Sequence, residues 1–150
     1  MPIMIVGADT GIGRPIVEHV VDSVREVRAF VSDSHIAAEL KALGVKTALG
    51  DVSDDSHVGA ACTNVFTAVL VGEAAEDARE RSFASTPAAV LAAWSRAVSG
   101  AGVRRVLWVG VSEPPDVSVP EVAVVATEGP IEEIVRTVAS LDASGSIRDP

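Results

Sequence analysis

The chain has 150 residues, of which 48% are hydrophobic and 22% are charged, and its formal net charge is −9. This is the length of a single domain, and its apolar content excludes an intrinsically disordered chain. A negative surface repels phosphate backbones, so we expect no nucleic-acid partner, and no apolar run reaches the roughly 18 residues needed to span a membrane.

The N-terminus and the cysteine count indicate a cytoplasmic protein without a metal site. Residues 1–9 lack a basic region, unlike a signal peptide, so we expect a cytoplasmic location. The single cysteine, Cys62, excludes an internal disulfide and a cysteine-based zinc site, and its apolar helix favours core packing over a reactive thiol. The three histidines do not have the spacing of metal ligands.

The first half of the chain alternates apolar runs with segments of helical length. The run Ile3–Val6 ends at Gly7, as a buried parallel strand would, and apolar residues then recur at helical spacing. The pattern predicts strands at 3–6, 27–31, 45–49 and 65–71, and helices at 12–24, 34–43 and 53–62. Residues 72–85 are polar and are predicted to form a solvated loop, with a lid as the alternative.

The second half continues the alternation. A helix is predicted over 86–98, because Pro87 is tolerated at its first position, and it is followed by a strand at 104–111. Residues 122–126 fit a strand or a helical turn, and 131–141 fit a final helix. The alternation predicts an α/β fold with a doubly wound parallel sheet in one domain, 1–150, in which the arrangement of 113–150 stays open.

The segment 7–15, Gly-Ala-Asp-Thr-Gly-Ile-Gly-Arg-Pro, lies between the first strand and the first helix. Glycines let the backbone approach a phosphate, and a helix N-terminus supplies free N–H groups and a positive dipole. This placement predicts a pyrophosphate cradle, with a tight turn that binds nothing as the alternative. The candidate cofactor-binding residues of the turn are Gly7, Asp9, Thr10, Gly11, Ile12 and Gly13.

Polar residues also follow the second and third strands. Ser32 and Asp33 lie about 20 residues after the glycines, where an acid would contact a ribose, although either would equally cap the helix that follows. Asp51 follows the third strand and fits either an adenine contact or a helix cap.

Three further candidate residues lie at or just after the ends of the fourth and fifth strands. Val71 and Gly72 would allow the backbone to approach the ribose or the nicotinamide. The hydroxyl of Ser112 would face a substrate, which makes it the candidate catalytic residue.

At these residues the chain resembles the short-chain dehydrogenase/reductase superfamily, and in particular its atypical, NmrA-like and epimerase-related branch. The resemblance covers residues 3–112 and rests on the segments 7–17, 27–33, 49–54 and 105–112. It implies a Rossmann-like fold that binds NAD or NADP, with Asp51 and Val52 beside the adenine and Ser112 matching the serine after the fifth strand.

The departures from that family limit the expected chemistry. Ser32 stands where an arginine often holds a 2′-phosphate, which favours NAD slightly, unless Arg14 compensates. The chain has no tyrosine and no lysine beyond Lys46, so the catalytic Tyr-x-x-x-Lys pair is not present, and these residues do not supply the usual C-terminal substrate-binding region. The proton donor is therefore missing.

These observations predict a nicotinamide dinucleotide-binding protein with weak or no reductase activity, and with redox sensing as a possible role. One alternative is an active oxidoreductase or epimerase-like enzyme that uses Ser112. The other is a scaffold that has lost the ligand and forms a homodimer through helix 87–98. From its place on a long apolar helix, Trp94 is expected to pack in the core, with an interface anchor as the alternative.

Overall fold

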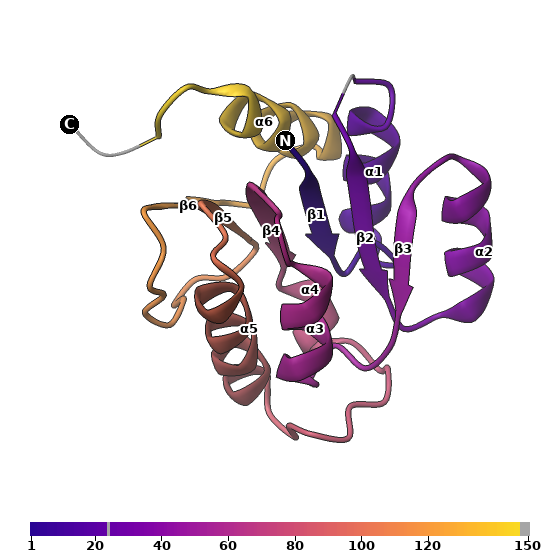
Figure 1. The fold of residues 1–150 in the computed structure, drawn as a ribbon, viewed down its shortest axis with the longest axis vertical. Coiled ribbons are helices and arrows are strands. Elements are labelled where there is room, and N and C mark those ends of the chain that lie inside the picture. The colour runs from indigo at the N-terminus through magenta and orange to yellow at the C-terminus, as the bar shows by residue number, and fades with distance from the viewer. Residues whose placement is uncertain (24, 148–150) are drawn as a thin grey trace.

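Six parallel strands form one sheet in the computed structural model, which describes residues 1–23 and 25–147 (Figure 1). Residue 24 of the predicted first helix and residues 148–150 of the predicted domain lie outside the described residues. The strand order is β3-β2-β1-β4-β5-β6. The strands are β1 (Ile3–Val6), β2 (Val27–Val31), β3 (Lys46–Leu49), β4 (Thr67–Val71), β5 (Arg105–Val109) and β6 (Glu121–Val125).

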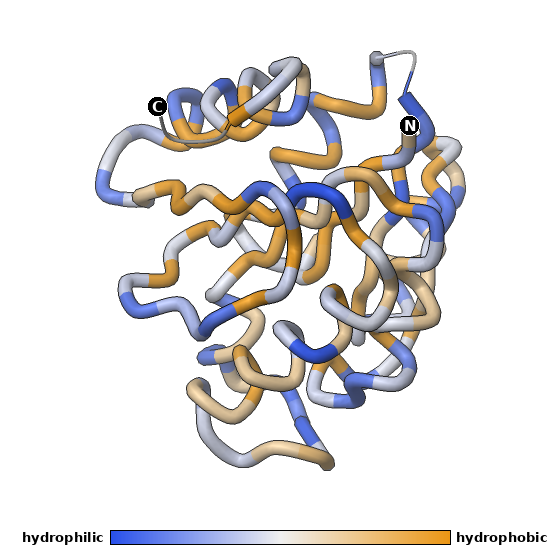
Figure 2. The backbone as a smooth tube through the Cα atoms, turned by 60° about the vertical axis from the view of Figure 1, so that its left-hand side comes forward, coloured by the Kyte–Doolittle hydropathy of each residue, from blue (hydrophilic) through white to orange (hydrophobic). Residues whose placement is uncertain are grey.

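Helices cover both faces of the sheet, because alternate residues of each strand point to opposite faces. Ile3 and Ile5 of β1 belong to one apolar core, whereas Met4 and Val6 belong to the other. The first core is covered by α1 (Gly13–Val20), α2 (Ser34–Ala42) and α6 (Ile131–Ala143). The second is covered by α3 (Asp55–Ala61), α4 (Glu73–Glu76) and α5 (Pro87–Ala101). Figure 2 shows the apolar segments of the chain gathered between these two layers.

The parallel α/β fold predicted from the sequence is confirmed, and the helix boundaries follow from their caps. Asp33 caps α2, Asp54 caps α3 and Thr86 caps α5, each by accepting a hydrogen bond from a backbone N–H of the first turn. The first helix is shorter than predicted and ends at Val20. The Ser23 hydroxyl donates to the Val20 carbonyl at 2.7 Å, and β2 begins at Val27.

One segment differs from the prediction, and another decides between two predicted alternatives. The predicted loop 72–85 contains the short helix α4, because Ala74 and Ala75 pack into the core and carry one helical turn with them. Residues 121–125 form β6, which pairs in parallel with β5 and takes its place at the edge of the sheet.

The topology creates a crevice at the carboxyl edge of the sheet. β1 lies between β2 and β4, so the chain leaves β1 on one side of the sheet and β4 on the other. Such switch points are where open α/β sheets bind ligands. Within the part of the chain that the structure describes, no helix is long and apolar enough to cross a lipid bilayer.

Candidate functional site

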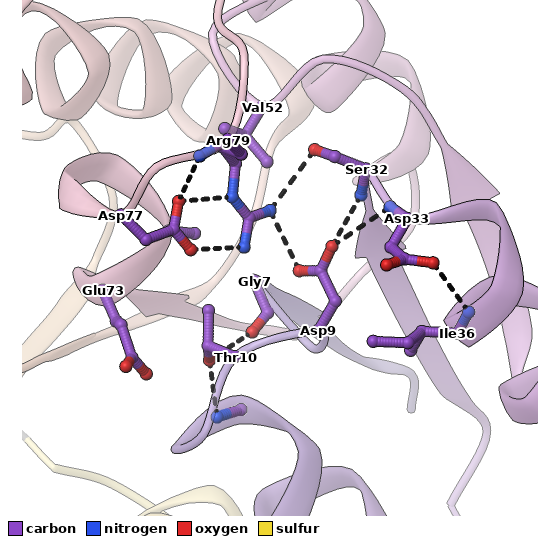
Figure 3. A network of polar contacts seen from close by, with 12 residues as sticks. Gly7, Asp9, Thr10, Ser32, Asp33, Ile36, Val52, Glu73, Asp77 and Arg79 are labelled. Atoms are coloured by element: carbon purple, nitrogen blue, oxygen red, sulfur yellow. Dashed lines mark hydrogen bonds and ion pairs between the residues drawn. The ribbon is translucent and has the colours of Figure 1, made fainter.

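The turn after β1 is held closed by its own residues. Gly7 has a φ of 89°, and a Cβ on Gly13 would lie 2.0 Å from the Gly7 carbonyl oxygen, so no larger residue fits at either position without a shift. The Thr10 hydroxyl donates to that carbonyl at 2.7 Å and accepts from the Gly13 N–H at 2.8 Å (Figure 3). These contacts fix a tight turn that leads directly into α1.

The first turn of α1 already faces an anion. The Ile12 N–H donates to a carboxylate oxygen of Glu73, 3.3 Å away. A Cβ added to Gly11 would meet only the two Glu73 carboxylate oxygens, at 3.8 and 3.9 Å. The backbone is therefore bare on the side that faces the crevice, and its exposed N–H group takes a negative charge. Both features fit a pyrophosphate.

Asp9 joins the turn to the end of β2. One of its oxygens accepts the Ser32 N–H at 2.9 Å and the Asp33 N–H at 3.2 Å. Asp33 itself accepts from the N–H groups of His35 and Ile36, as the cap of α2. The cap interpretation of Asp33 is thus confirmed, and Asp9 is a second acid beside it at the end of β2 (Figure 3).

Arg79 reaches the same point from the segment after α4. Its guanidinium donates to the second Asp9 oxygen at 2.9 Å and to the Ser32 hydroxyl at 3.3 Å. Two further nitrogens donate to Asp77, each at 2.8 Å. Burial opposes the charge of Arg79, but the hydrogen bonds and charges of Asp77 and Asp9 outweigh it and raise the pKa of Arg79.

A cavity of about 510 Å³ opens beside these residues, which is within the range of small-molecule sites. It is lined by Asp9, Ser32, Asp33, Gly50, Asp51, Arg79, Glu80 and Ser82. Asp51 accepts hydrogen bonds from Ser53 and from the Ser82 N–H. Burial opposes the Asp51 charge, but these hydrogen bonds lower the pKa of Asp51. Val52, expected beside the adenine, is fully buried and is not among the residues that line this cavity.

A second cavity, of about 210 Å³, lies at the ends of β4 and β5. Gly72 and the exposed Ser112 line it, together with the acidic side chains of Glu76 and Glu113, whereas Val71 is fully buried at the end of β4. A Cβ on Gly72 would lie 2.9 Å from the Gly110 carbonyl oxygen, so the two strand ends approach closely. The structure thus places a second, smaller pocket, lined by both polar and apolar residues, at the ends of these two strands.

Sequence reasoning missed Glu73 and Arg79. Each contacts the turn from more than 60 residues away, and their segment reads as a solvated acidic loop. The only signal was the topology, because the chain that leaves β4 must pass beside the turn that leaves β1. Arg14, considered as a phosphate ligand, instead pairs with Glu39 of α2 at 2.9 Å.

Two further residues are placed in the core. Trp94 is fully buried, and its indole N–H donates to the Val52 carbonyl at 2.8 Å, so the predicted core packing is confirmed and the alternative of an interface anchor is wrong. Cys62 is also fully buried, and burial raises the pKa of its thiol to about 12, which confirms the packing role.

Comparisons with known proteins agree with this geometry. A family model described as NAD(P)H-binding matches residues 7–140. No curated protein matches the chain significantly. Among solved structures, the NADP(H) complex of Citrobacter sp. triphenylmethane reductase is 20% identical, with a TM-score of 0.61 over 73% of this chain and 37% of that one.

Two other solved structures show the same fold. ChuY, an anaerobilin reductase from Escherichia coli O157:H7, is 23% identical, with a TM-score of 0.56 over 73% of this chain and 50% of that one. A short-chain dehydrogenase/reductase from Veillonella parvula in complex with NADP is 18% identical, with a TM-score of 0.59 over 74% of this chain and 48% of that one. This chain therefore spans half or less of the length of these three proteins.

Proposed function

The chain belongs to the NAD(P)H-binding family, and from this premise we propose that it binds a nicotinamide dinucleotide across the crevice, with NAD(H) preferred. The turn 7–13 would hold the pyrophosphate, the cavity beside Asp51 would take the adenosine, and the cavity beside Ser112 would take the nicotinamide. The observation that carries the proposal is the Ile12 N–H, which is already directed at a carboxylate in the crevice. Such an amide suits a phosphate oxygen equally well.

The preference for NAD(H) is supported by charge. Among the residues that the structure describes, Asp9, Asp33, Asp51 and Glu80 line the adenosine cavity, and Arg79 is the one basic residue of this lining. This acidic surrounding disfavours the added 2′-phosphate of NADP(H). Two of the similar structures hold NADP(H), so an NAD(H) preference would come from residues of this chain.

The residue types available for proton transfer support cofactor binding more than conventional reduction. The cofactor would supply the hydride, so the protein would have to position a substrate and hold a proton. The chain has no tyrosine, and Lys46 lies at the start of β3 and pairs with Glu26 at 3.0 Å. Redox sensing would follow if the oxidised and reduced cofactors bind with different affinities.

Calorimetry with NAD⁺, NADH, NADP⁺ and NADPH tests the proposal. We expect saturable binding with micromolar to millimolar Kd values and tighter binding of the NAD(H) pair. A different Kd for NAD⁺ and NADH would support the sensing role. The absence of binding heat and of any thermal shift with all four nucleotides would reject the proposal. It would instead favour a scaffold that has lost the ligand.

An oxidoreductase or epimerase-like activity is the second candidate, because Ser112, Glu76 and Glu113 line one small cavity. Turnover of a carbonyl substrate with reduced cofactor, lost in Ser112→Ala, would support this activity. Turnover that survives Ser112→Ala would exclude Ser112 as its catalytic residue. The homodimer through α5 and the cytoplasmic location remain predictions, to be checked by sedimentation and by cell fractionation.

A further inference from the structure

The end of β2 carries an anion-binding group of donors that the protein fills with its own side chain. Two backbone N–H groups, from Ser32 and Asp33, and the Arg79 guanidinium all donate to the Asp9 carboxylate, at 2.9 to 3.2 Å (Figure 3). The Asp9 side chain is only 3% exposed and that of Arg79 only 11%. This is a desolvated pocket for one negative group, assembled from two amides and one cation.

This pocket lies where a bound dinucleotide would place its adenosine ribose. In doubly wound dinucleotide-binding sheets, the end of the second strand faces the adenosine ribose. An acid there accepts a hydrogen bond from the 2′-hydroxyl of NAD, and an arginine accommodates the 2′-phosphate of NADP. Here both residue types meet at one point, and the carboxylate already holds the donors.

We propose that Asp9 is the residue that sets dinucleotide specificity, because its carboxylate fills the donors that a 2′-phosphate would need. This inference rests on the proposed function. A 2′-phosphate would compete with Asp9 for the amides of Ser32 and Asp33, and the two negative groups would repel each other. A 2′-hydroxyl brings no charge and donates to the carboxylate. Asp9 therefore selects NAD(H) against NADP(H).

The same geometry makes the selection reversible by one substitution. Asp77 holds the Arg79 guanidinium through two hydrogen bonds of 2.8 Å that do not involve Asp9. When Asp9 loses its charge, Arg79 therefore stays beside the end of β2. The two amides and the guanidinium then form a pocket for a phosphate rather than for a carboxylate.

Titration of NADH and NADPH, followed by calorimetry, tests this inference in the full chain. The wild type should bind NADH at least about tenfold more tightly than NADPH, which corresponds to about 1.4 kcal/mol. Asp9→Ser should bring this ratio to one or below, chiefly by tightening NADPH. The double variant Asp9→Ser/Arg79→Gln should lose the gain for NADPH. Asp9→Asn, which keeps the side-chain shape, is the second variant if Asp9→Ser does not fold.

Glu132→Gln is the matched control for net charge, because it removes one exposed negative charge from α6, outside the lining of this cavity, and leaves Asp9 in place. It should change the NADH to NADPH ratio less than twofold. The fragment 2′,5′-ADP should bind the Asp9 variant more tightly than the wild type, which would assign the change to the adenosine end.

Three results would overturn the inference while leaving the proposed binding of a nicotinamide dinucleotide intact. They are equal binding of NADH and NADPH by the wild type, an unchanged ratio in both Asp9 variants, or an equal change in Glu132→Gln. If the wild type binds none of the four nucleotides, the proposed function itself fails. The same set of titrations therefore separates the two failures.

Discussion

The Glu73 carboxylate lies 3.3 Å from the backbone nitrogen of Ile12, so a side chain of α4 supplies an anion to the first turn of α1. The N-terminus of a helix attracts negative charge through its free N–H groups and its dipole. A pyrophosphate bound at this turn would meet Glu73 as a competitor. The affinity of the crevice for a dinucleotide should therefore be limited by this carboxylate.

Removal of the Glu73 charge should strengthen dinucleotide binding. In Glu73→Gln we expect the Kd for NADH to fall about fivefold, since the repulsion of a nearby phosphate is worth about 1 kcal/mol at a screened surface. Calorimetry measures the change, and Glu132→Gln on the exposed side of α6 is the control for net charge. An unchanged or weaker affinity in Glu73→Gln would contradict this account of the turn.

Alanine at two glycines of the turn should separate folding from binding. A Cβ on Gly13 would lie 2.0 Å from the Gly7 carbonyl oxygen, so Gly13→Ala should destabilise the fold by about 1–3 kcal/mol. A Cβ on Gly11 would meet only Glu73, at 3.8 Å or more. Gly11→Ala should therefore keep the unfolding free energy within about 1 kcal/mol of the wild type. It should nevertheless raise the Kd for NADH about tenfold, because the added methyl group would lie on the side of the turn that faces the pyrophosphate.

Urea denaturation and calorimetry on the same two samples check this prediction. If Gly11→Ala binds NADH as tightly as the wild type, the turn does not hold the pyrophosphate. If Gly13→Ala is as stable as the wild type, the turn is less tightly packed than the structure indicates.

The buried pair Arg105–Glu121 should govern stability in acid. Hydrogen bonds from the Ile147 N–H and from two arginines outweigh burial and lower the pKa of Glu121 to about 2. A carboxyl whose pKa is lowered by folding stabilises the fold at any pH above the pKa that it has in the unfolded chain, near 4.5. This contribution is lost as the pH falls toward 2. The free energy of unfolding should therefore decrease over this interval.

Glu121→Gln isolates this contribution, because the other carboxylates remain in both proteins. The variant should be less stable at pH 7 by about 3 kcal/mol or more, since the fully buried Arg105 loses its counter-charge. Its disadvantage should shrink as the pH falls from 4.5 toward 2. Urea titrations at several pH values measure both, and a difference that stays constant over this range would refute the pairing.

The hydrogen bond from Trp94 of α5 to the chain beside the adenosine cavity should stabilise the fold. Its indole N–H satisfies the carbonyl of the buried Val52, next to Asp51 in the cavity lining. Trp94→Phe leaves this carbonyl unpaired and should cost about 1–3 kcal/mol of unfolding free energy. Circular dichroism in urea measures the loss, because Trp108 complicates the fluorescence signal. A loss below about 0.5 kcal/mol would show that the hydrogen bond contributes little to stability.

The core of the fold was predictable because it depends on local pattern. The apolar run of β1, the glycine turn and the periodicity of α1 are adjacent in the chain, so they can be read together. The end of α1 was not predictable, because the apolar spacing continues past Val20 while the Ser23 hydroxyl closes the helix. The helix α4 was missed because it depends on the burial of two alanines against distant residues.

The candidate site was predictable only where its residues lie at strand ends. Thr10 and Asp51 lie within four residues of the ends of their strands, so their place at the crevice follows from the parallel sheet. The partner of Asp9 could not be found in this way. Arg79 is 70 residues away in the chain, and its contact with Asp9 depends on the path of the chain after α4. Hydrophobic periodicity does not predict that path.

A crystal structure determined after soaking with NADH tests the central claim most directly. The account predicts electron density for a pyrophosphate over residues 7–13, with the Glu73 carboxylate displaced from the Ile12 N–H and the adenosine beside Asp51. If the Glu73 carboxylate keeps its place on the Ile12 N–H and no nucleotide density lies over the turn at saturating NADH, the account is contradicted.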